Sequence, residues 1–276
     1  WLYASSLISL LLVELALRRT TGGKPDRIAW LLAGVALGFG TLIKESGAFV
    51  LAGAVLWVIF RLRIRRAAGP LACLLLAAAL TNLPWPLRNL IRTGHFEPLT
   101  SLSGVNLFIA FNDFADGGAD QNFLPLEVTA DCRDEFAVCA VYREHALAWI
   151  KAHPGRALAL IPAKLWRFFR PFPDPVDAHR VQIWFAGCYW LLVYVCAIGV
   201  WLLPASPDAR RELAGFLLPF MIIFCVVHGI FPGLARYRYV LEPMLLVAAA
   251  ICLARMASFT AALLSRQPAL SSSGSS

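Results

Sequence analysis

The sequence predicts an all-α polytopic membrane protein, a bundle of transmembrane helices with a mixed outer loop domain. Hydrophobic residues make up 59% of the chain and charged residues only 15%. The hydrophobic residues lie in long continuous runs rather than at the spacing of an amphipathic helix, which excludes a soluble globular fold. Short basic segments flank several of these runs, as is typical of the cytoplasmic ends of membrane spans.

The first apolar run covers residues 1–17 and reads WLYASSLISLLLVELAL. It has no initiator methionine, no basic leader and no small-residue cleavage site, so it does not have the form of a signal peptide. We interpret it as a truncated first span and expect the N-terminal part of the protein to precede it.

Residues 28–60 are too long for one span and short for two. Cations lie on both flanks: Arg18, Arg19, Lys24 and Arg27 before the stretch, and Arg61, Arg63, Arg65 and Arg66 after it. Because short basic loops stay in the cytoplasm, both flanks are expected inside. The stretch is therefore predicted to be a broken hairpin of two short helices. Its tip, residues 44–47, is expected to bring Lys44 and Glu45 to the outer face or just beneath it.

The remaining apolar runs predict the organisation of the rest of the chain. Residues 70–87 form the exit span that ends the first transmembrane part, and three further spans follow a long polar segment. The predicted C-terminal spans are residues 181–203, 214–232 and 240–254. The resulting parts are transmembrane helices over 1–87, an outer loop over 88–180, transmembrane helices over 181–260 and a disordered tail over 261–276.

The outer loop is expected to be ordered. Residues 105–111, VNLFIAF, fit either a short buried strand or an apolar patch, and residues 133–152 are typical of a helix. Residues 155–170 predict an interfacial helix, because their apolar run is short, contains Lys164 and carries aromatic residues typical of the headgroup level. If this helix crossed the membrane instead, the orientation of every later span would be reversed.

Two cysteines of the outer loop differ from the other five, which lie within apolar runs. Cys132 and Cys139 lie close together in a polar, exported segment, where a disulfide is permitted. The alternative is a pair of free thiols. The sequence does not decide between these two states.

No motif of a soluble enzyme is present, and the chemical signal comes from cations at the outer ends of spans. These cations are Lys44, Arg88, Arg92, Arg236 and Arg238. Together they predict a site for one anionic group at membrane depth, for which a lipid phosphate is the natural candidate. The alternative for any single arginine is that it extends to the lipid headgroups without a specific ligand. Lys44 is the exception, because it lies beside Glu45 within an apolar hairpin.

Four passages resemble the GT-C membrane glycosyltransferases of family 39, which include protein mannosyltransferases and aminoarabinose transferases. The passages are AGVALGFGTLIKESG at residues 33–47, PWPLRNLIRTGHFEPLTSLSGVNLFIAFN at 84–112, HALAWIKAHPGRALALIPAKLWRFF at 145–169 and HGIFPGLARYRYVLEPMLL at 228–246. The resemblance implies a GT-C-like helix bundle. It also implies transfer of a sugar from a polyprenyl-phosphate-linked donor to an acceptor at the outer face of the membrane.

The resemblance also implies roles for particular residues. Lys44, Arg88, Arg236 and Arg238 are expected to bind the carrier phosphate. The residues expected to support them are Glu45, Arg92, Asn106, Asn112, Lys164 and His228. The family's catalytic carboxylate lies upstream of residue 1, so no catalytic residue is assigned and this piece is expected to be inactive alone.

The expected partners are membrane lipids, the lipid-linked donor, and an acceptor that is a protein, a lipid or a polysaccharide; nucleic acid is not expected. No cofactor is assigned, and a requirement for a divalent metal is left open. The Ala-, Arg- and Leu-rich composition favours a bacterial inner membrane. Two other classes remain as alternatives: a transporter or lipid flippase, for which a broken hairpin with intramembrane charge is equally suitable, and a noncatalytic membrane scaffold.

Overall fold

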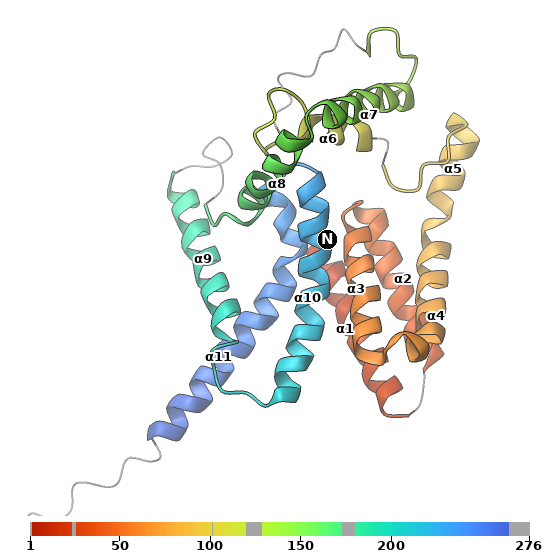
Figure 1. Ribbon diagram of the computed structural model, residues 1–276. Helices are drawn as coiled ribbons and strands as arrows, with labels where there is room; N and C mark the ends of the chain where they lie inside the picture. Colours follow the sequence, from red (N-terminus) through yellow and green to blue (C-terminus); the bar gives the residue numbers. More distant parts are fainter. Residues whose placement is uncertain (1, 24–25, 101, 120–128, 173–179, 265–276) are drawn as a thin grey trace, which may run out of the picture. The chain divides into compact units, whose positions relative to one another are not determined.

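The computed structural model describes residues 2–23, 26–100, 102–119, 129–172 and 180–264, and within these residues it contains helices and no strand (Figure 1). The elements are α1 (Leu2–Thr21), α2 (Arg27–Ile43), α3 (Gly47–Leu62), α4 (Ile64–Asn82), α5 (Pro84–Thr93), α6 (Ser103–Ala110), α7 (Glu135–Ala152), α8 (Pro154–Phe169), α9 (Arg180–Gly199), α10 (Pro207–Ile230), the 3₁₀-helix η2 (Ala235–Val240) and α11 (Glu242–Leu264). The predicted all-α class is therefore confirmed.

Four helical segments are long and apolar enough to cross a membrane. They are Ile64–Thr93, Arg180–Gly199, Pro207–Ile230 and Glu242–Ala261. The two helices of the hairpin, α2 and α3, are apolar but shorter. The predicted first span is helical over Leu2–Thr21, carries Glu14 in its interior, and is not one of the four. The chain is thus an all-α polytopic membrane protein.

The chain forms two compact units. One contains Trp1–Arg170 and Gly215–Pro243, and the other contains Pro171–Ala214 and Met244–Ser276. The division predicted from membrane topology is a different description of the chain and stays a prediction. Every candidate site residue named above lies in the first unit.

Glycine allows α2 to lie close against α4 in the first unit. A Cβ atom at Gly34 would lie 2.3 Å from the carbonyl oxygen of Leu74, and one at Gly38 would lie 2.8 Å from that of Ala78. Such small-xxx-small spacing is typical of helices that pack in membranes, because it lets the two backbones approach. The Asn82 side-chain amide then donates to the Gly38 carbonyl oxygen at 3.1 Å. These contacts fix one face of the hairpin.

The other helix of the hairpin packs against the part of α10 that belongs to the same unit. A Cβ atom at Gly53 would lie 2.3 Å from the ring of Phe220, so only glycine leaves room for this ring. The Trp57 ring lies edge-on to Phe216, with ring centroids 4.9 Å apart. Aromatic packing along α3 thus places the end of α10 beside the hairpin tip.

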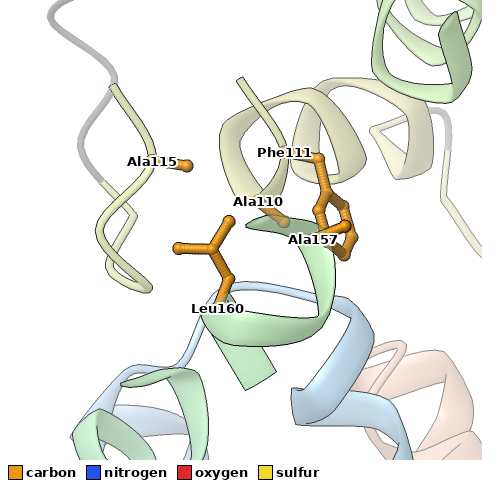
Figure 2. Close-up of a cluster of buried hydrophobic side chains, with 5 residues drawn as sticks. All are labelled: Ala110, Phe111, Ala115, Ala157 and Leu160. Atoms are coloured by element: carbon orange, nitrogen blue, oxygen red, sulfur yellow. The ribbon is translucent and has the colours of Figure 1, made fainter. Parts of the chain in front are cut away.

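The alternative that VNLFIAF forms a strand is wrong, because Ser103–Ala110 is the helix α6. Its end packs on α8, and the resulting cluster of buried side chains is shown in Figure 2: Ala110, Phe111, Ala115, Ala157 and Leu160. A helix satisfies its backbone hydrogen bonds internally, whereas a strand here would have no partner strand among the described residues. Helical packing therefore overrides the β-propensity of the segment.

The alternative that Cys132 and Cys139 form a disulfide is also wrong, because both are free thiols. Cys139 is buried on the face of α7 that packs against α6. The backbone N–H of Gly104 donates to its sulfur at 3.0 Å, and a Cβ atom at Gly104 would lie 1.9 Å from the Cys139 carbonyl oxygen. The Cys139 thiol is thus directed toward α6 and takes part in its packing.

In the second unit, α9 and α11 are joined at the C-terminal end of α9. The guanidinium of Arg255 donates to the carbonyl oxygen of Val200 at 3.0 Å, where a helix leaves its last carbonyls unpaired. The helix α11 continues to Leu264, so residues 261–264, which were expected in the tail, are helical. The rest of the predicted tail lies outside the described residues.

Candidate functional site

A pocket of about 100 Å³ lies at the tip of the α2–α3 hairpin, and we call it the hairpin-tip pocket. It lies wholly within the first unit and is bounded by the tip, α6, the end of α10 and η2. Its lining residues are Lys44, Glu45, Ser46, Phe49, Thr100, Ser103, Asn106, Val227, His228, Phe231, Pro232 and Tyr237. Eight of these twelve side chains carry a polar or charged group, but most of the lining surface is apolar, as in sites for small molecules.

Lys44 is the cation of this pocket. It ends α2 in an extended conformation, and the chain turns back at once into α3. Gly47 permits this turn, because a Cβ atom there would lie 2.4 Å from the Gly40 carbonyl oxygen. The half-buried Lys44 ammonium lies 5.2 Å from the ring centroid of Tyr237 and has no hydrogen-bond or carboxylate partner among the described residues. Its charge is therefore available to an anion in the pocket.

Ser46 supplies an unpaired polar atom to the same pocket. Its side chain is buried, and its hydroxyl has no hydrogen-bond partner among the described residues. A buried hydroxyl without a partner costs free energy, so such an atom in a native structure requires an explanation. A ligand in the hairpin-tip pocket provides one.

His228 forms part of an aromatic stack that leads to Lys44. Its ring stacks on Phe168 with centroids 4.2 Å apart and on Tyr237 with centroids 5.5 Å apart. Its Nδ1 lies 3.3 Å from the Pro232 carbonyl oxygen. Because a carbonyl oxygen only accepts, this nitrogen carries a proton, and Nε2 is the acceptor when the ring is neutral. The histidine therefore fixes the loop after α10 and supports the ring beneath Lys44.

Lys164, a predicted supporting residue, lies outside the lining of the pocket. Its side chain is fully buried in α8, and its ammonium donates to the Ile230 carbonyl oxygen at 2.9 Å. The ammonium also lies 3.3 Å from the ring centroid of Phe111. Burial lowers the pKa of Lys164 to about 7. Since Ile230 ends α10, Lys164 binds one of the carbonyls that a helix leaves unpaired at its C-terminus.

Two glycines close the chain around Lys164. A Cβ atom at Gly233 would lie 1.9 Å from the Lys164 carbonyl oxygen, and one at Gly117 would lie 2.9 Å from its backbone nitrogen. The N–H of Gly233 donates to the carbonyl oxygen of Gly117 at 2.9 Å. The segments that contain Gly117 and Gly233 thus both pack against α8 at Lys164, which explains the complete burial of this lysine.

Arg238 also binds the C-terminal end of a helix. It is buried, and its guanidinium donates to the carbonyl oxygens of Phe169 at 3.3 Å and Arg170 at 2.6 Å, at the end of α8. A cation is favourable there because the C-terminal end of a helix carries partial negative charge. These contacts give Arg238 a structural role in joining η2 to α8.

The other predicted residues lie in different surroundings. Arg88 and Arg92 are exposed on α5, where the Arg88 guanidinium lies 5.5 Å from the ring centroid of Trp85. Asn112 is buried, and its amide donates to the Phe108 carbonyl oxygen at 2.9 Å, so it caps the end of α6. The backbone of Arg236 lies in η2, but its side chain is outside the described residues.

The structure therefore brings four of the predicted residues into one pocket: Lys44, Glu45, Asn106 and His228. Sequence reasoning missed Ser46 and Tyr237, although each is a neighbour of a residue that it selected. Phe168 was assigned to the headgroup level with the other aromatic residues of the interfacial helix, whereas its ring is buried and stacks on His228. Among the described residues no group of three or more His, Cys, Asp or Glu side chains is placed to hold a metal ion.

Comparison with known families adds an independent finding. Residues 2–100 match the family described as dolichyl-phosphate-mannose-protein mannosyltransferase. No curated protein and no solved structure matches the chain. The matched segment contains α1 to α5 and the Lys44 tip, and it confirms the resemblance to GT-C protein mannosyltransferases. The finding shows that residues 2–100 are similar to this family of membrane mannosyltransferases.

Proposed function

We propose, from the mannosyltransferase-like character of residues 2–100, that the protein transfers a sugar from a polyprenyl-phosphate-linked donor to an acceptor at the outer face of the membrane. In this proposal the chain supplies the carrier-phosphate half of the active site. The single observation that carries the proposal is the unpaired Lys44 ammonium in the hairpin-tip pocket, within the segment that matches the family.

The proposed chemistry is electrostatic at the leaving group. The bond between the sugar carbon and the carrier-phosphate oxygen breaks, and a bond from the acceptor oxygen to that carbon forms. Negative charge develops on the departing phosphate, and a cation fixed against it stabilises the transition state more than the ground state. Lys44 is the proposed cation. The acceptor proton passes to a carboxylate that acts as the general base.

The other lining groups have proposed binding roles. The Ser46 hydroxyl donates to a phosphate oxygen, because burial without a partner makes this hydrogen bond favourable. The ring of Tyr237 forms the apolar surface against which Lys44 lies, and the His228 ring stacks on Tyr237. Arg88 and Arg236 remain proposed second cations for the carrier phosphate. For Arg238 and Lys164, their bonds to helix carbonyls favour a positioning role rather than direct contact with the phosphate.

The proposal also covers the acceptor, the location and the partners. The acceptor is a protein, a lipid or a polysaccharide, and the proposed location is a bacterial inner membrane with the acceptor on its outer side. The proposed partners are membrane lipids and the lipid-linked sugar.

The test is transfer of radiolabelled sugar from membrane-extracted polyprenyl-phosphate donors by the full-length protein in membranes. Lys44→Ala is expected to lower the rate roughly 100-fold or more, the effect of removing one fixed group that stabilises transition-state charge. Lys44→Arg, which keeps the charge but changes the geometry, is expected to retain part of the rate. The matched control is Lys151→Ala, since Lys151 is an exposed lysine of α7.

The proposal is contradicted if Lys44→Ala transfers sugar at the wild-type rate, or if Lys151→Ala loses as much activity as Lys44→Ala. If the wild-type protein consumes no donor but moves the lipid-linked sugar across vesicle membranes, the transporter alternative replaces the enzyme. Comparable amounts of folded protein in each membrane preparation are a condition of the comparison.

A further inference from the structure

Four arginines surround a second pocket at the opposite end of α3 from Lys44. This pocket has a volume of about 500 Å³ and is lined by one short segment: Arg61, Leu62, Arg63, Ile64, Arg65 and Arg66. We call this segment the arginine turn. It joins α3 to α4 and lies wholly within the first unit.

The guanidinium groups of three of these arginines have no ion-pair partner among the described residues. Arg63, Arg65 and Arg66 are exposed, and no carboxylate among the described residues pairs with them. The lining itself contains no acidic residue. An unpaired cluster of guanidinium groups around a cavity is suited to an anion with several oxygens, because each planar fork can donate two parallel hydrogen bonds.

The backbone of the arginine turn adds to its positive potential. Arg63 is the N-cap of α4, its side chain makes no capping hydrogen bond, and the first turn of α4 contains no acidic residue. The N-terminal end of a helix carries partial positive charge, so cations at this end repel both the helix and one another. An external anion relieves this repulsion and also pairs with the unbonded N–H groups of the first turn.

The surroundings of the arginine turn identify the source of the anion as a lipid. The helix α3 has 16 residues, so its two ends lie roughly 24 Å apart, somewhat less than the roughly 30 Å of the hydrocarbon core. In the membrane topology predicted from the flanking charges, the turn and the Lys44 tip lie on opposite sides of the bilayer. Phe60 and Ile64 beside the arginines are 59% and 70% exposed, and apolar side chains in this position contact acyl chains.

We propose that the arginine turn binds the phosphate headgroup of an anionic phospholipid, in the leaflet opposite to the one that the hairpin-tip pocket faces. Arg63, Arg65 and Arg66 contact the phosphate oxygens, and Arg61 completes the cavity wall. The bound lipid stabilises the start of α4, the helix against which α2 and its Lys44 end are packed. This site is separate from the proposed donor site, and it does not depend on the glycosyltransferase proposal.

The experiment measures lipid binding to the purified full chain in a non-ionic detergent by native mass spectrometry. The probes are phosphatidylglycerol and phosphatidylcholine with the same acyl chains. The test variant carries Arg63→Gln, Arg65→Gln and Arg66→Gln. The matched control carries Arg133→Gln, Arg143→Gln and Lys151→Gln, which removes three exposed cations from the α7 region. A third arm adds inorganic phosphate as a competitor.

The wild type is expected to bind phosphatidylglycerol more tightly than phosphatidylcholine. The test variant is expected to lose affinity for phosphatidylglycerol by roughly 100-fold, if each arginine contributes as it does at an anionic bilayer surface. The control is expected to keep the wild-type affinity. The proposal is overturned if the test variant keeps that affinity, if the control loses as much, or if inorganic phosphate displaces the lipid at equal concentration.

Thermal unfolding supplies a second readout that does not depend on counting bound lipids. Phosphatidylglycerol is expected to raise the Tm of the wild type and the control, but not that of the test variant, because a ligand that binds only the folded state stabilises it. Without lipid, the test variant is expected to be at least as stable as the wild type, since repulsion at the start of α4 is removed. A lipid-induced rise in Tm that survives in the test variant contradicts the proposal.

Discussion

Lys44 and Lys164 are both lysines in apolar surroundings, but they differ in what their ammonium groups contact. Lys164 is fully buried and donates to the carbonyl oxygen of Ile230 at the end of α10. Lys44 is half-buried, lies over the ring of Tyr237 and has no hydrogen-bond acceptor among the described residues. The first lysine is thus satisfied by the protein, whereas the second is available to a ligand. Lys44 is therefore the stronger candidate for ligand binding, because the protein leaves its charge unpaired.

Arg238 differs from Lys44 in the same way, because the protein itself supplies its hydrogen-bond acceptors. Replacing Arg238 is therefore expected to have the largest effect on stability. Arg238→Ala removes a buried guanidinium that donates to the carbonyl oxygens of Phe169 and Arg170. The free energy of unfolding is expected to fall by about 3–5 kcal/mol, because two half-buried carbonyls lose their donor and a cavity forms. Denaturant unfolding in detergent checks this. Tyr239→Ala, at an exposed position of the same 3₁₀-helix, is the control and is expected to have little effect.

Lys164→Ala is expected to have the next largest effect, a loss of about 2–4 kcal/mol in the free energy of unfolding. The Ile230 carbonyl loses its donor, and a cavity forms. Lys164→Met keeps most of the side-chain volume and is expected to cost less, because an apolar side chain often replaces a buried charge at little cost. The two variants are compared by the same unfolding measurement. If the methionine variant is as unstable as the alanine variant, the lost side-chain volume does not explain part of the effect, and this prediction for Lys164 is contradicted.

The pH dependence of stability is expected to distinguish wild type from Lys164→Met. The pKa of Lys164 is about 7 in the folded protein, below its value of 10.5 in the unfolded chain. Between these values the unfolded chain binds more protons, so the stability of the wild type rises with pH, by at most about 1.4 kcal/mol per pH unit. The methionine variant lacks this contribution. Unfolding curves at several pH values between 7 and 10 are the measurement, and identical slopes would show that Lys164 does not titrate as described.

Ser46→Ala is expected to have the smallest effect on stability. It tests a polar group that the protein leaves unpaired, whereas Arg238 and Lys164 are paired. The buried Ser46 hydroxyl has no partner among the described residues, so its removal is expected to raise the free energy of unfolding of the ligand-free protein by about 1 kcal/mol. The KM for the lipid-linked donor is expected to rise roughly tenfold, because a hydrogen bond to a charged oxygen is lost. Ser258→Ala, in α11, is the control for both measurements.

Much of the fold was predictable from the sequence, because apolar runs of spanning length are a strong signal. The hairpin with its tip at Lys44 followed from the basic segments on both sides, and α7 and α8 followed from their patterns. The segment VNLFIAF was ambiguous, because β-branched and aromatic residues fit either a strand or a buried helix. Its helical state depends on packing against α8, which no local pattern reveals.

The candidate site was predictable only in part. An ionisable pair at Lys44 and Glu45 within an apolar hairpin is visible in the sequence, and both residues line the pocket. The burial of Lys164 against the end of α10 is not visible, because it depends on the meeting of segments about 66 residues apart. Likewise, the sequence ARYRY does not show which of its arginines bonds to the end of α8. The contact between α8 and η2 identifies Arg238 as that residue. Local sequence identifies cations, but only tertiary structure shows which of them are paired.

The most direct test of the account is the kcat/KM for the lipid-linked donor, measured for Lys44→Ala and Arg238→Ala and expressed per folded molecule. The account predicts that Lys44→Ala loses roughly 100-fold or more with an unchanged Tm, because it removes stabilisation of the leaving phosphate. It predicts that Arg238→Ala lowers the Tm, while the folded fraction keeps most of its activity. The opposite result, full activity in Lys44→Ala and loss per folded molecule in Arg238→Ala, would contradict the account and make Arg238 the phosphate ligand.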